Sequence, residues 1–142
     1  MQIVTDSGTD LFLPAEQMER LQVHTVPLIV TFEGRTYREA VDIQKDEFYR
    51  LLAASNSLPI TSQPSVGSLV DIYRRLAATD PDILSIHISS GLSGTVNAAQ
   101  AAAAQVPEAH VTIVDTKTLS TPAGWQVEAA LLFTQTPRLI EL

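Results

Sequence analysis

The sequence contains no cysteine among its 142 residues. This absence excludes a disulfide scaffold, a cysteine-based zinc site and a thiol nucleophile. A domain of this size buries roughly 68–70% of the surface of its unfolded chain, so it can build a core without such cross-links. We therefore expect residues 1–142 to form a single domain.

Basic residues are scarce as well. Nine Lys and Arg stand against 16 Asp and Glu, which gives a formal net charge of −7. Nucleic-acid-binding proteins usually carry a basic patch that neutralises phosphates, and the sequence offers no cluster beyond the pair Arg74-Arg75. The same acidity argues against docking on an anionic membrane surface. We expect no nucleic-acid partner.

Long apolar segments are also missing. No apolar run approaches the roughly 18–20 residues that a transmembrane helix needs. The first six residues, Met1 to Asp6, lack the basic segment and the long apolar run of a signal peptide. We therefore expect a cytoplasmic protein that does not insert into a membrane.

The chain instead alternates short β-rich runs with helical patterns. The runs that predict strands are Gln2–Thr5, Val23–Phe32, Asp82–Ser89 and His110–Val114, with Thr36-Tyr37 as a short antiparallel partner. Helical patterns cover Ala15–Leu21, Val96–Gln105 and Pro122–Phe133. A fourth helix is expected from an N-cap at Asp42 to Ala54, with Phe48, Leu51 and Leu52 on its inner face, and a fifth begins after a cap at Ser65. Strands separated by helices predict an α/β fold, a mostly parallel sheet with helices on both faces.

Polar segments follow several of the predicted strands. In open α/β sheets, ligands bind beyond the carboxyl ends of the strands. Thr5–Thr9, Ser89–Thr95 and Asp115–Lys117 fall at such ends. The polar turn Thr61–Ser65 is a fourth candidate, because we expect it to open a helix.

Two of these segments combine groups that favour an anion. In Ser89–Thr95 the glycines allow a tight turn with exposed N–H groups, and the helix that follows adds a partial positive charge. Thr61–Ser65 offers hydroxyls in the same setting. Together the two segments predict a site for a small, singly charged group such as a carboxylate, since neither contains Lys or Arg. Taken alone, each pattern also fits ordinary helix capping.

Motifs of common enzymes are absent. The sequence has no Gly-x-Ser-x-Gly elbow, no P-loop and no dinucleotide-binding fingerprint. A serine hydrolase that uses Ser93 or Ser7 is a weak hypothesis, because no His–Asp pairing with a suitable motif accompanies either serine. Asp6, Asp42 and Asp115 are a conceivable metal site, but acids at strand ends and caps are usually structural. We expect no catalytic residue, no metal and no cofactor.

Two rarer residue types favour structural roles. His87 alternates with Ser85 and Ser89 on one strand face, which predicts a histidine whose hydrogen bonds are satisfied by its neighbours. His24, at the start of a strand, is expected on the surface. Trp125 is expected to pack in the core or at an interface rather than to line a pocket.

Five ordered segments resemble motifs of the DegV family. They are Val4–Leu11; Val26–Leu28 with Gly34, Tyr37, Asp42-Ile43 and Phe48-Tyr49; Thr61–Gly67; Ile88–Thr95; and Val114–Lys117 with Ser120 and Gly124. The resemblance runs from about Gln2 to about Ala130. Five motifs in the family's order are far more specific than any one of them.

The resemblance implies a fatty-acid-binding protein that is not itself an enzyme. Family members carry the acid to a fatty-acid kinase, which phosphorylates its carboxyl group. The family's carboxylate-binding residues correspond to Thr61 and Ser93, and their neighbours Ser62 and Gly94 can add further donors. A long-chain fatty acid would then be the bound ligand, with its acyl chain in an apolar tunnel.

The chain departs from the family in its length. Family members are about twice as long, and their second α/β domain closes the tunnel and contributes further head-group residues. We therefore expect this sequence to correspond to the N-terminal half, as a fragment, a disrupted gene product or a stand-alone domain, with an atypical tail at residues 131–142. Half a tunnel would expose an apolar face, which favours association with a second copy or a partner chain. The alternative function is a structural or interaction domain without ligand binding.

Overall fold

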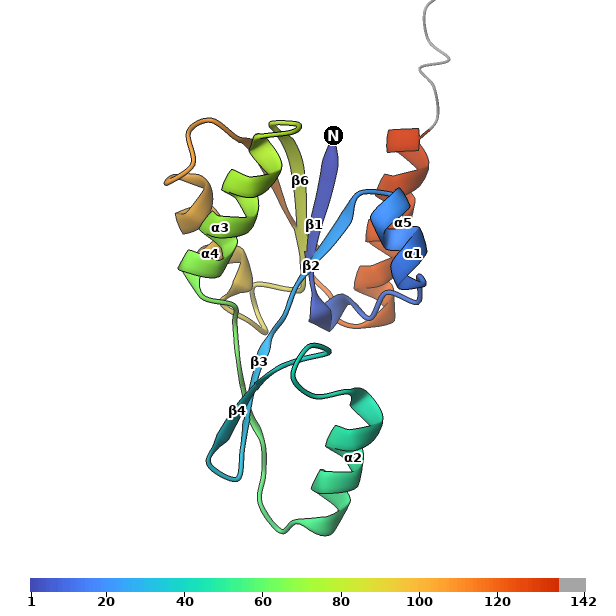
Figure 1. Ribbon diagram of the computed structural model, residues 1–142, viewed down its shortest axis with the longest axis vertical. Coiled ribbons are helices and arrows are strands. Elements are labelled where there is room, and N and C mark those ends of the chain that lie inside the picture. Colours follow the sequence, from blue (N-terminus) through green and yellow to red (C-terminus); the bar gives the residue numbers. More distant parts are fainter. Residues whose placement is uncertain (136–142) are drawn as a thin grey trace, which may run out of the picture.

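The computed structural model describes residues 1–135, which form two sheets (Figure 1). The larger sheet has four parallel strands in the order β2-β1-β6-β7. Its strands are β1 (Gln2–Asp6), β2 (Val23–Val26), β6 (Asp82–His87) and β7 (His110–Asp115). The predicted parallel α/β sheet is thereby confirmed.

Strand β1 lies inside this sheet and is buried along its whole length. A parallel strand with both faces covered needs apolar residues in succession rather than in alternation, and Ile3-Val4 provides them. Val4 is in register with His24 of β2 and Ser85 of β6. The carboxyl ends of β1 and β6 therefore lie side by side at the same edge of the sheet.

Helices cover both faces of the parallel sheet, as predicted (Figure 1). The helices of one face are α3 (Val66–Ala77) and α4 (Thr95–Ala103), and those of the other are α1 (Ala15–Arg20) and α5 (Thr121–Gln135). Leu69 and Tyr73 of α3 pack with Ala99 of α4 in one core. Val127 of α5 packs with Ile3 in the other.

The smaller sheet and one helix form what we call the small lobe, residues 29–62. Its elements are β3 (Ile29–Phe32), β4 (Arg35–Arg38), α2 (Lys45–Ala54) and β5 (Ile60–Ser62). The three strands pair antiparallel in the order β4-β3-β5. The pairing of Thr36-Tyr37 with the preceding strand is thus confirmed. Figure 1 shows the lobe beyond the carboxyl ends of β1 and β6.

The prediction of one continuous strand over Val23–Phe32 is wrong. The run is divided between β2 in the parallel sheet and β3 in the small lobe. Pro27, at the division, has no N–H for a ladder. The N–H of Leu28 donates to the Ser7 hydroxyl at 2.9 Å instead of to a neighbouring strand.

The predicted N-cap of α2 is wrong. Of its predicted inner face, Phe48 and Leu52 are half-buried, whereas Leu51 is exposed. The helix begins at Lys45 after Gln44, and the Asp42 carboxylate accepts hydrogen bonds from the backbone N–H and the guanidinium of Arg38, at 2.8–2.9 Å. No residue of α2 is buried. Phe48 nevertheless packs edge-on against Phe32 of β3, with ring centroids 6.2 Å apart.

The structure extends α5 beyond its predicted bounds of Pro122–Phe133, to Thr121–Gln135. Residues 131–135, the first part of the predicted atypical tail, therefore continue this helix. The rest of that tail, residues 136–142, lies outside the described residues.

Candidate ligand-binding site

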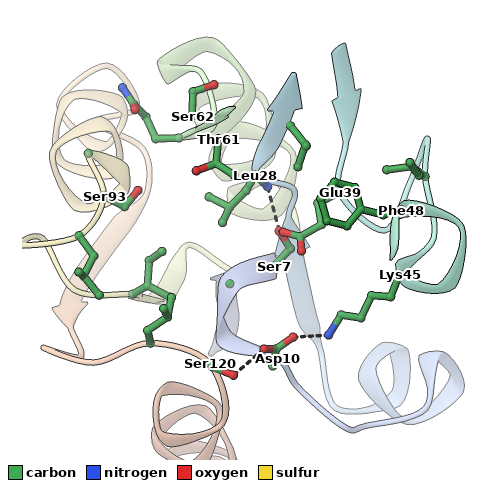
Figure 2. Close-up of a pocket in the computed structure, with 18 of the residues that line it drawn as sticks. Ser7, Asp10, Leu28, Glu39, Lys45, Phe48, Thr61, Ser62, Ser93 and Ser120 are labelled. Carbon is green, nitrogen blue, oxygen red and sulfur yellow. Dashed lines mark hydrogen bonds and ion pairs between the residues drawn. The ribbon is translucent and has the colours of Figure 1, made fainter. Parts of the chain in front are cut away.

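A cavity of about 690 Å³ lies where the parallel sheet meets the small lobe (Figure 2). This volume is within the roughly 300–1,000 Å³ of small-molecule sites in proteins. Leu28, Val30, Phe48, Ile88 and Leu92 supply much of its apolar wall. The cavity thus lies beyond the carboxyl ends of β1 and β6, where ligands of open α/β sheets bind.

All four residues predicted to bind a ligand line this one cavity: Thr61, Ser62, Ser93 and Gly94. In Figure 2 the hydroxyls of Thr61 and Ser93 point toward one another from β5 and from the turn before α4. The Ser62 side chain points away from Ser93. Adjacent residues of a strand face opposite sides, so only one of Thr61 and Ser62 can present its hydroxyl to Ser93.

The expectation that Thr61 lies at a helix start is wrong. Thr61 belongs to β5 and is in register with Val30 of β3. Helix α3 begins only at Val66, and the Ser65 side chain caps it by accepting from the N–H of Ser68 at 3.0 Å, as predicted for Ser65. The site therefore combines one strand and one helix start, rather than two helix starts.

The other half of the site is the start of α4. Gly94 occupies its N-cap position, and the Ser93 hydroxyl is hydrogen-bonded to that of Thr95 at 2.8 Å. A side chain at Gly94 would meet Gln63, because an added Cβ would lie only 3.1–3.3 Å from three atoms of that side chain. Glycine thus lets the segment after β5 approach α4 closely.

Two donors at this end of the cavity are not used by the described part of the protein itself. Among residues 1–135, neither the Thr61 hydroxyl nor the Gly94 N–H has a hydrogen-bond partner. Hydroxyls and backbone amides bind carboxylates through strong charge-assisted hydrogen bonds. This end of the cavity is therefore neutral and suited to an anion.

The opposite end of the cavity carries charges that the sequence did not lead us to predict. Lys45 of α2 forms an ion pair with Asp10, and the Ser120 hydroxyl donates to the same carboxylate at 2.6 Å (Figure 2). The Ser7 hydroxyl donates to Glu39 at 2.6 Å. Two carboxylates against one ammonium make this end negative.

The protonation of the Asp10–Lys45 pair follows from these contacts. Burial raises the pKa of Asp10, but hydrogen bonds from Lys45 and Ser120 outweigh burial and hold the pKa below its ordinary value. The hydrogen bond to Asp10 raises the pKa of Lys45. Both groups are thus charged at neutral pH. Asp10 and Ser120 belong to motifs noted in the sequence, but no local pattern indicates that they meet.

A buried chain of hydrogen bonds joins α3, β6 and β1. Tyr73 is bonded to Ser85 at 2.7 Å, Ser85 to His87 Nε2 at 2.8 Å, and His87 Nδ1 to Asp6 at 2.9 Å. All four side chains are fully buried, and burial raises the pKa of Tyr73 to about 12. The prediction that His87 is satisfied by its neighbours is confirmed.

These hydrogen bonds show a His–Asp pair, whereas the sequence indicated no His–Asp pairing near a candidate nucleophile. It is joined to Ser85, whereas the hydrolase hypothesis named Ser93 or Ser7. Ser85, His87 and Asp6 are bonded in the order of a catalytic Ser-His-Asp triad. Ser85, however, is fully buried and also hydrogen-bonded to Tyr73. A substrate cannot reach it, so the arrangement is structural.

The three aspartates weighed as a metal site do not gather. Asp6 pairs with His87, Asp42 with Arg38 and Asp115 with Lys117. Within residues 1–135, no group of three or more His, Asp or Glu side chains is placed to hold a metal ion.

None of the helices in this described part is long and apolar enough to cross a membrane.

Two single residues differ from their predicted settings. His24 is partly buried rather than on the surface, and its Nε2 has no hydrogen-bond partner among the described residues. Trp125 is not in the core: it is 63% exposed and lines a second groove, with Leu13 and Leu21.

The sequence matches a family described as "Uncharacterised protein, DegV family" over residues 1–136. A DegV domain-containing protein of Staphylococcus aureus (strain N315) is 40% identical over 126 residues, which cover 89% of this chain and 44% of that protein.

Solved structures give the same result. This chain resembles DegV of Bacillus subtilis, described as a fatty acid binding protein, with 36% identity and a TM-score of 0.87 over 94% of this chain and 46% of that one. It also resembles a DegV family protein of Thermus thermophilus that is described as binding fatty acid, with 37% identity and a TM-score of 0.83. That match covers 97% of this chain and 49% of the Thermus chain. The chain therefore spans about half the length of these relatives. Sequence motifs and fold agree with these similarities, and the chain belongs to the DegV family.

Proposed function

We propose that this chain binds a long-chain fatty acid, holds its carboxylate between Thr61 and Ser93, and presents it to a fatty-acid kinase. The observation that carries the proposal is one cavity with apolar walls and, at one end, neutral donors that no other residue in the described part of the chain uses. The descriptions of the Bacillus and Thermus relatives as fatty-acid-binding proteins support it.

The head-group end supplies hydrogen bonds without a formal charge. Thr61 and Ser93 donate from their hydroxyls, Gly94 donates from its N–H, and α4 adds the partial positive charge of a helix N-terminus. Ser62 contributes through its backbone, since its side chain points away from Ser93 (Figure 2). Such a set suits a single negative charge.

The charged end of the cavity fixes the direction in which the ligand lies. Lys45 is already paired with Asp10, and Glu39 adds a second negative charge nearby. A fatty-acid carboxylate placed there would face net repulsion at short range, which is strong away from bulk water. The carboxylate therefore lies at the Thr61 and Ser93 end.

The acyl chain provides most of the affinity and the head group most of the selectivity. Burial stabilises by about 0.8 kcal/mol per methylene, so a dozen buried methylenes contribute on the order of 10 kcal/mol. A hydrogen bond to a charged group contributes about 1.5–3 kcal/mol. Tests of the head-group site must therefore compare ligands that have the same chain.

Native mass spectrometry of the purified protein tests lipid binding first, followed by identification of any released small molecule. We expect a mass increment equal to a fatty acid, and saturable uptake of added long-chain fatty acid after delipidation. A folded, delipidated protein that takes up none would contradict the proposal.

The kinase step needs a test of its own. The sequence contains no P-loop, so phosphoryl transfer is assigned to the partner. We expect lipid-loaded protein, mixed with a fatty-acid kinase and ATP, to yield acyl phosphate. Lipid that stays bound and unphosphorylated would contradict the kinase partner and leave the binding function standing.

The second candidate is a structural or interaction domain without a ligand. Exposed aromatic residues of α5 favour it, since Trp125 is 63% and Phe133 is 84% exposed. So does the length of the chain, about half that of its relatives. The same spectra decide between the candidates, because they show lipid and subunit number together.

A further inference from the structure

Helix α2 forms one wall of the cavity but is weakly attached to the parallel sheet. Lys45, Phe48 and Tyr49 of this helix line the cavity, and none of its residues is buried. Phe48 packs on Phe32, which belongs to the small lobe itself. Among residues 1–135, the side-chain bond that joins α2 to the parallel-sheet part is the ion pair of Lys45 with Asp10.

Asp10 lies where three segments meet. Its carboxylate binds Lys45 with one oxygen and the Ser120 hydroxyl with the other, at 2.6 Å (Figure 2). Ser120 in turn donates its N–H to the carbonyl of Gly8 at 2.8 Å. The carboxylate therefore ties α2 to the turn after β1 and to the segment that enters α5.

The backbone at this junction is held in a sparsely populated conformation. Asp10 has φ 45° and Ser120 has φ 58°, both in the left-handed region. Non-glycine residues stay there only when surrounding contacts fix them. The α5 helix supplies such a contact, because Gly124 leaves room for the carbonyl of Thr9, which would lie 2.6 Å from an added Cβ. The turn after β1 is thus held by contacts from Ser120 and α5, whereas α2 has no buried residue.

We propose that Asp10 is a positioning residue that retains the bound lipid by holding α2 against the parallel-sheet part through Lys45. The proposal rests on the proposed lipid binding and concerns the rate of exchange at that same cavity. With the ion pair broken, α2 moves away from the sheet and opens the apolar wall. The bound acid then leaves faster, while the Thr61 and Ser93 end keeps its preference for a carboxylate.

The chain offers a matched control. Arg38 forms an ion pair with Asp42, close before α2, and its side chain is 58% exposed, as is that of Lys45. That pair lies within one segment of the chain and does not reach the parallel sheet. Arg38→Met and Lys45→Met therefore each remove one positive charge and one ion pair, but only the second frees α2.

The test compares wild type with Lys45→Met, Asp10→Asn, the double variant and Arg38→Met. A fluorescent long-chain fatty acid is displaced from each by excess oleic acid in a stopped-flow instrument. We expect Lys45→Met to release it about two- to fivefold faster than wild type, the range for a largely exposed ion pair. The double variant should be no faster than Asp10→Asn alone, and Arg38→Met should match wild type.

Two further readouts separate positioning from other roles. Amide hydrogen exchange of α2 in lipid-free protein should increase in Lys45→Met and not in Arg38→Met. The ratio of acid to alcohol affinity should stay at the wild-type value in Lys45→Met. A fall of that ratio would make Lys45 a head-group ligand and overturn the proposal, as would equal release rates in Lys45→Met and Arg38→Met.

The outcomes also distinguish this proposal from the proposed function. If wild type binds no fatty acid, the function fails, and hydrogen exchange of α2 alone then tests the link to Asp10. Unchanged exchange in Lys45→Met would overturn that link. If wild type binds lipid and the variants release it at the wild-type rate, only the role of Asp10 fails.

Discussion

The two parts that enclose the cavity are built in different ways. The parallel sheet is covered by helices on both faces, and even its polar side chains, such as Asp6 and His87, are fully buried and hydrogen-bonded. The small lobe has three short strands and one helix with no buried residue. Sheets this small gain stability mainly from what they pack against.

This difference matters because the head-group site takes residues from both parts. Ser93 and Gly94 lie at the start of α4, on the well-packed sheet. Thr61 lies on β5, in the small lobe. Removing contacts of the parallel sheet should therefore unfold the chain, whereas removing contacts of the lobe should change ligand exchange and leave the fold intact.

The largest effect is expected for Asp6→Ala. The Asp6 carboxylate accepts from His87 Nδ1 at 2.9 Å, from the N–H of Ile88 at 3.1 Å and from the N–H of Gly8 at 3.0 Å. Its loss leaves the buried N–H groups of His87 and Ile88 without partners, at a cost of about 1–3 kcal/mol for each. Urea unfolding followed by circular dichroism measures this loss.

The control for Asp6→Ala is Asp42→Ala, which removes an exposed carboxylate of the segment between β4 and α2. We expect its unfolding midpoint to stay close to that of wild type. Equal losses of stability in Asp6→Ala and Asp42→Ala would contradict the claim that the parallel sheet, and not the small lobe, determines the stability of the fold.

Two glycine substitutions sharpen the comparison at a smaller scale. Gly124→Ala places a Cβ 2.6 Å from the carbonyl of Thr9, so α5 must shift from the sheet, which we expect to cost about 1–3 kcal/mol. Gly34→Ala meets no atom within 4 Å, and its cost of about 1 kcal/mol arises only from φ +77°. Thermal unfolding of the two variants measures both costs. A larger loss for Gly34→Ala would contradict this ranking.

The smallest effect concerns acid stability. The ordinary pKa of both Asp10 and Asp42 is 3.8. Burial raises the pKa of Asp10, but its hydrogen bonds with Lys45 and Ser120 outweigh burial and lower it. The hydrogen bonds of Asp42 with Arg38 lower the pKa of Asp42 to about 2. A carboxyl group with a lowered pKa stabilises the fold above its unfolded pKa, and this contribution is lost as the pH falls through its folded pKa. We therefore expect the melting temperature to decrease below pH 3.8.

The variants Asp10→Asn and Asp42→Asn should each flatten this decrease. They should differ in a second property, because Asp10 pairs with Lys45 of α2, whereas Asp42 pairs with Arg38 of β4. We expect faster amide exchange of α2 in Asp10→Asn alone. A melting temperature that rises as the pH falls below 3.8 would contradict the sign of both shifts.

Much of the fold could be predicted because its signals are local. The apolar runs of β1 and β6, and the Ser65 cap before the spacing of Leu69 and Tyr73, each lie within a few residues. The break in Val23–Phe32 could not be predicted in this way. It depends on the Ser7 hydroxyl, which comes from another strand end and accepts the N–H of Leu28.

The candidate site shows the same division. Thr61, Ser62, Ser93 and Gly94 could be selected from hydroxyl-rich segments and the family resemblance, and they do line one cavity. The Asp10–Lys45 pair was missed because its partners are 35 residues apart. No local pattern connects them, and their contact exists only after the small lobe has folded back onto the sheet.

The central claim is that Thr61 and Ser93 bind a carboxylate. The most direct measurement titrates delipidated wild type, Thr61→Val, Ser93→Ala and the control Thr36→Val with a long-chain fatty acid and with the alcohol of equal length. We predict that Thr61→Val and Ser93→Ala each weaken acid binding by about 1–3 kcal/mol, with a smaller loss for the alcohol and no loss in Thr36→Val. Equal losses for acid and alcohol would contradict the head-group site.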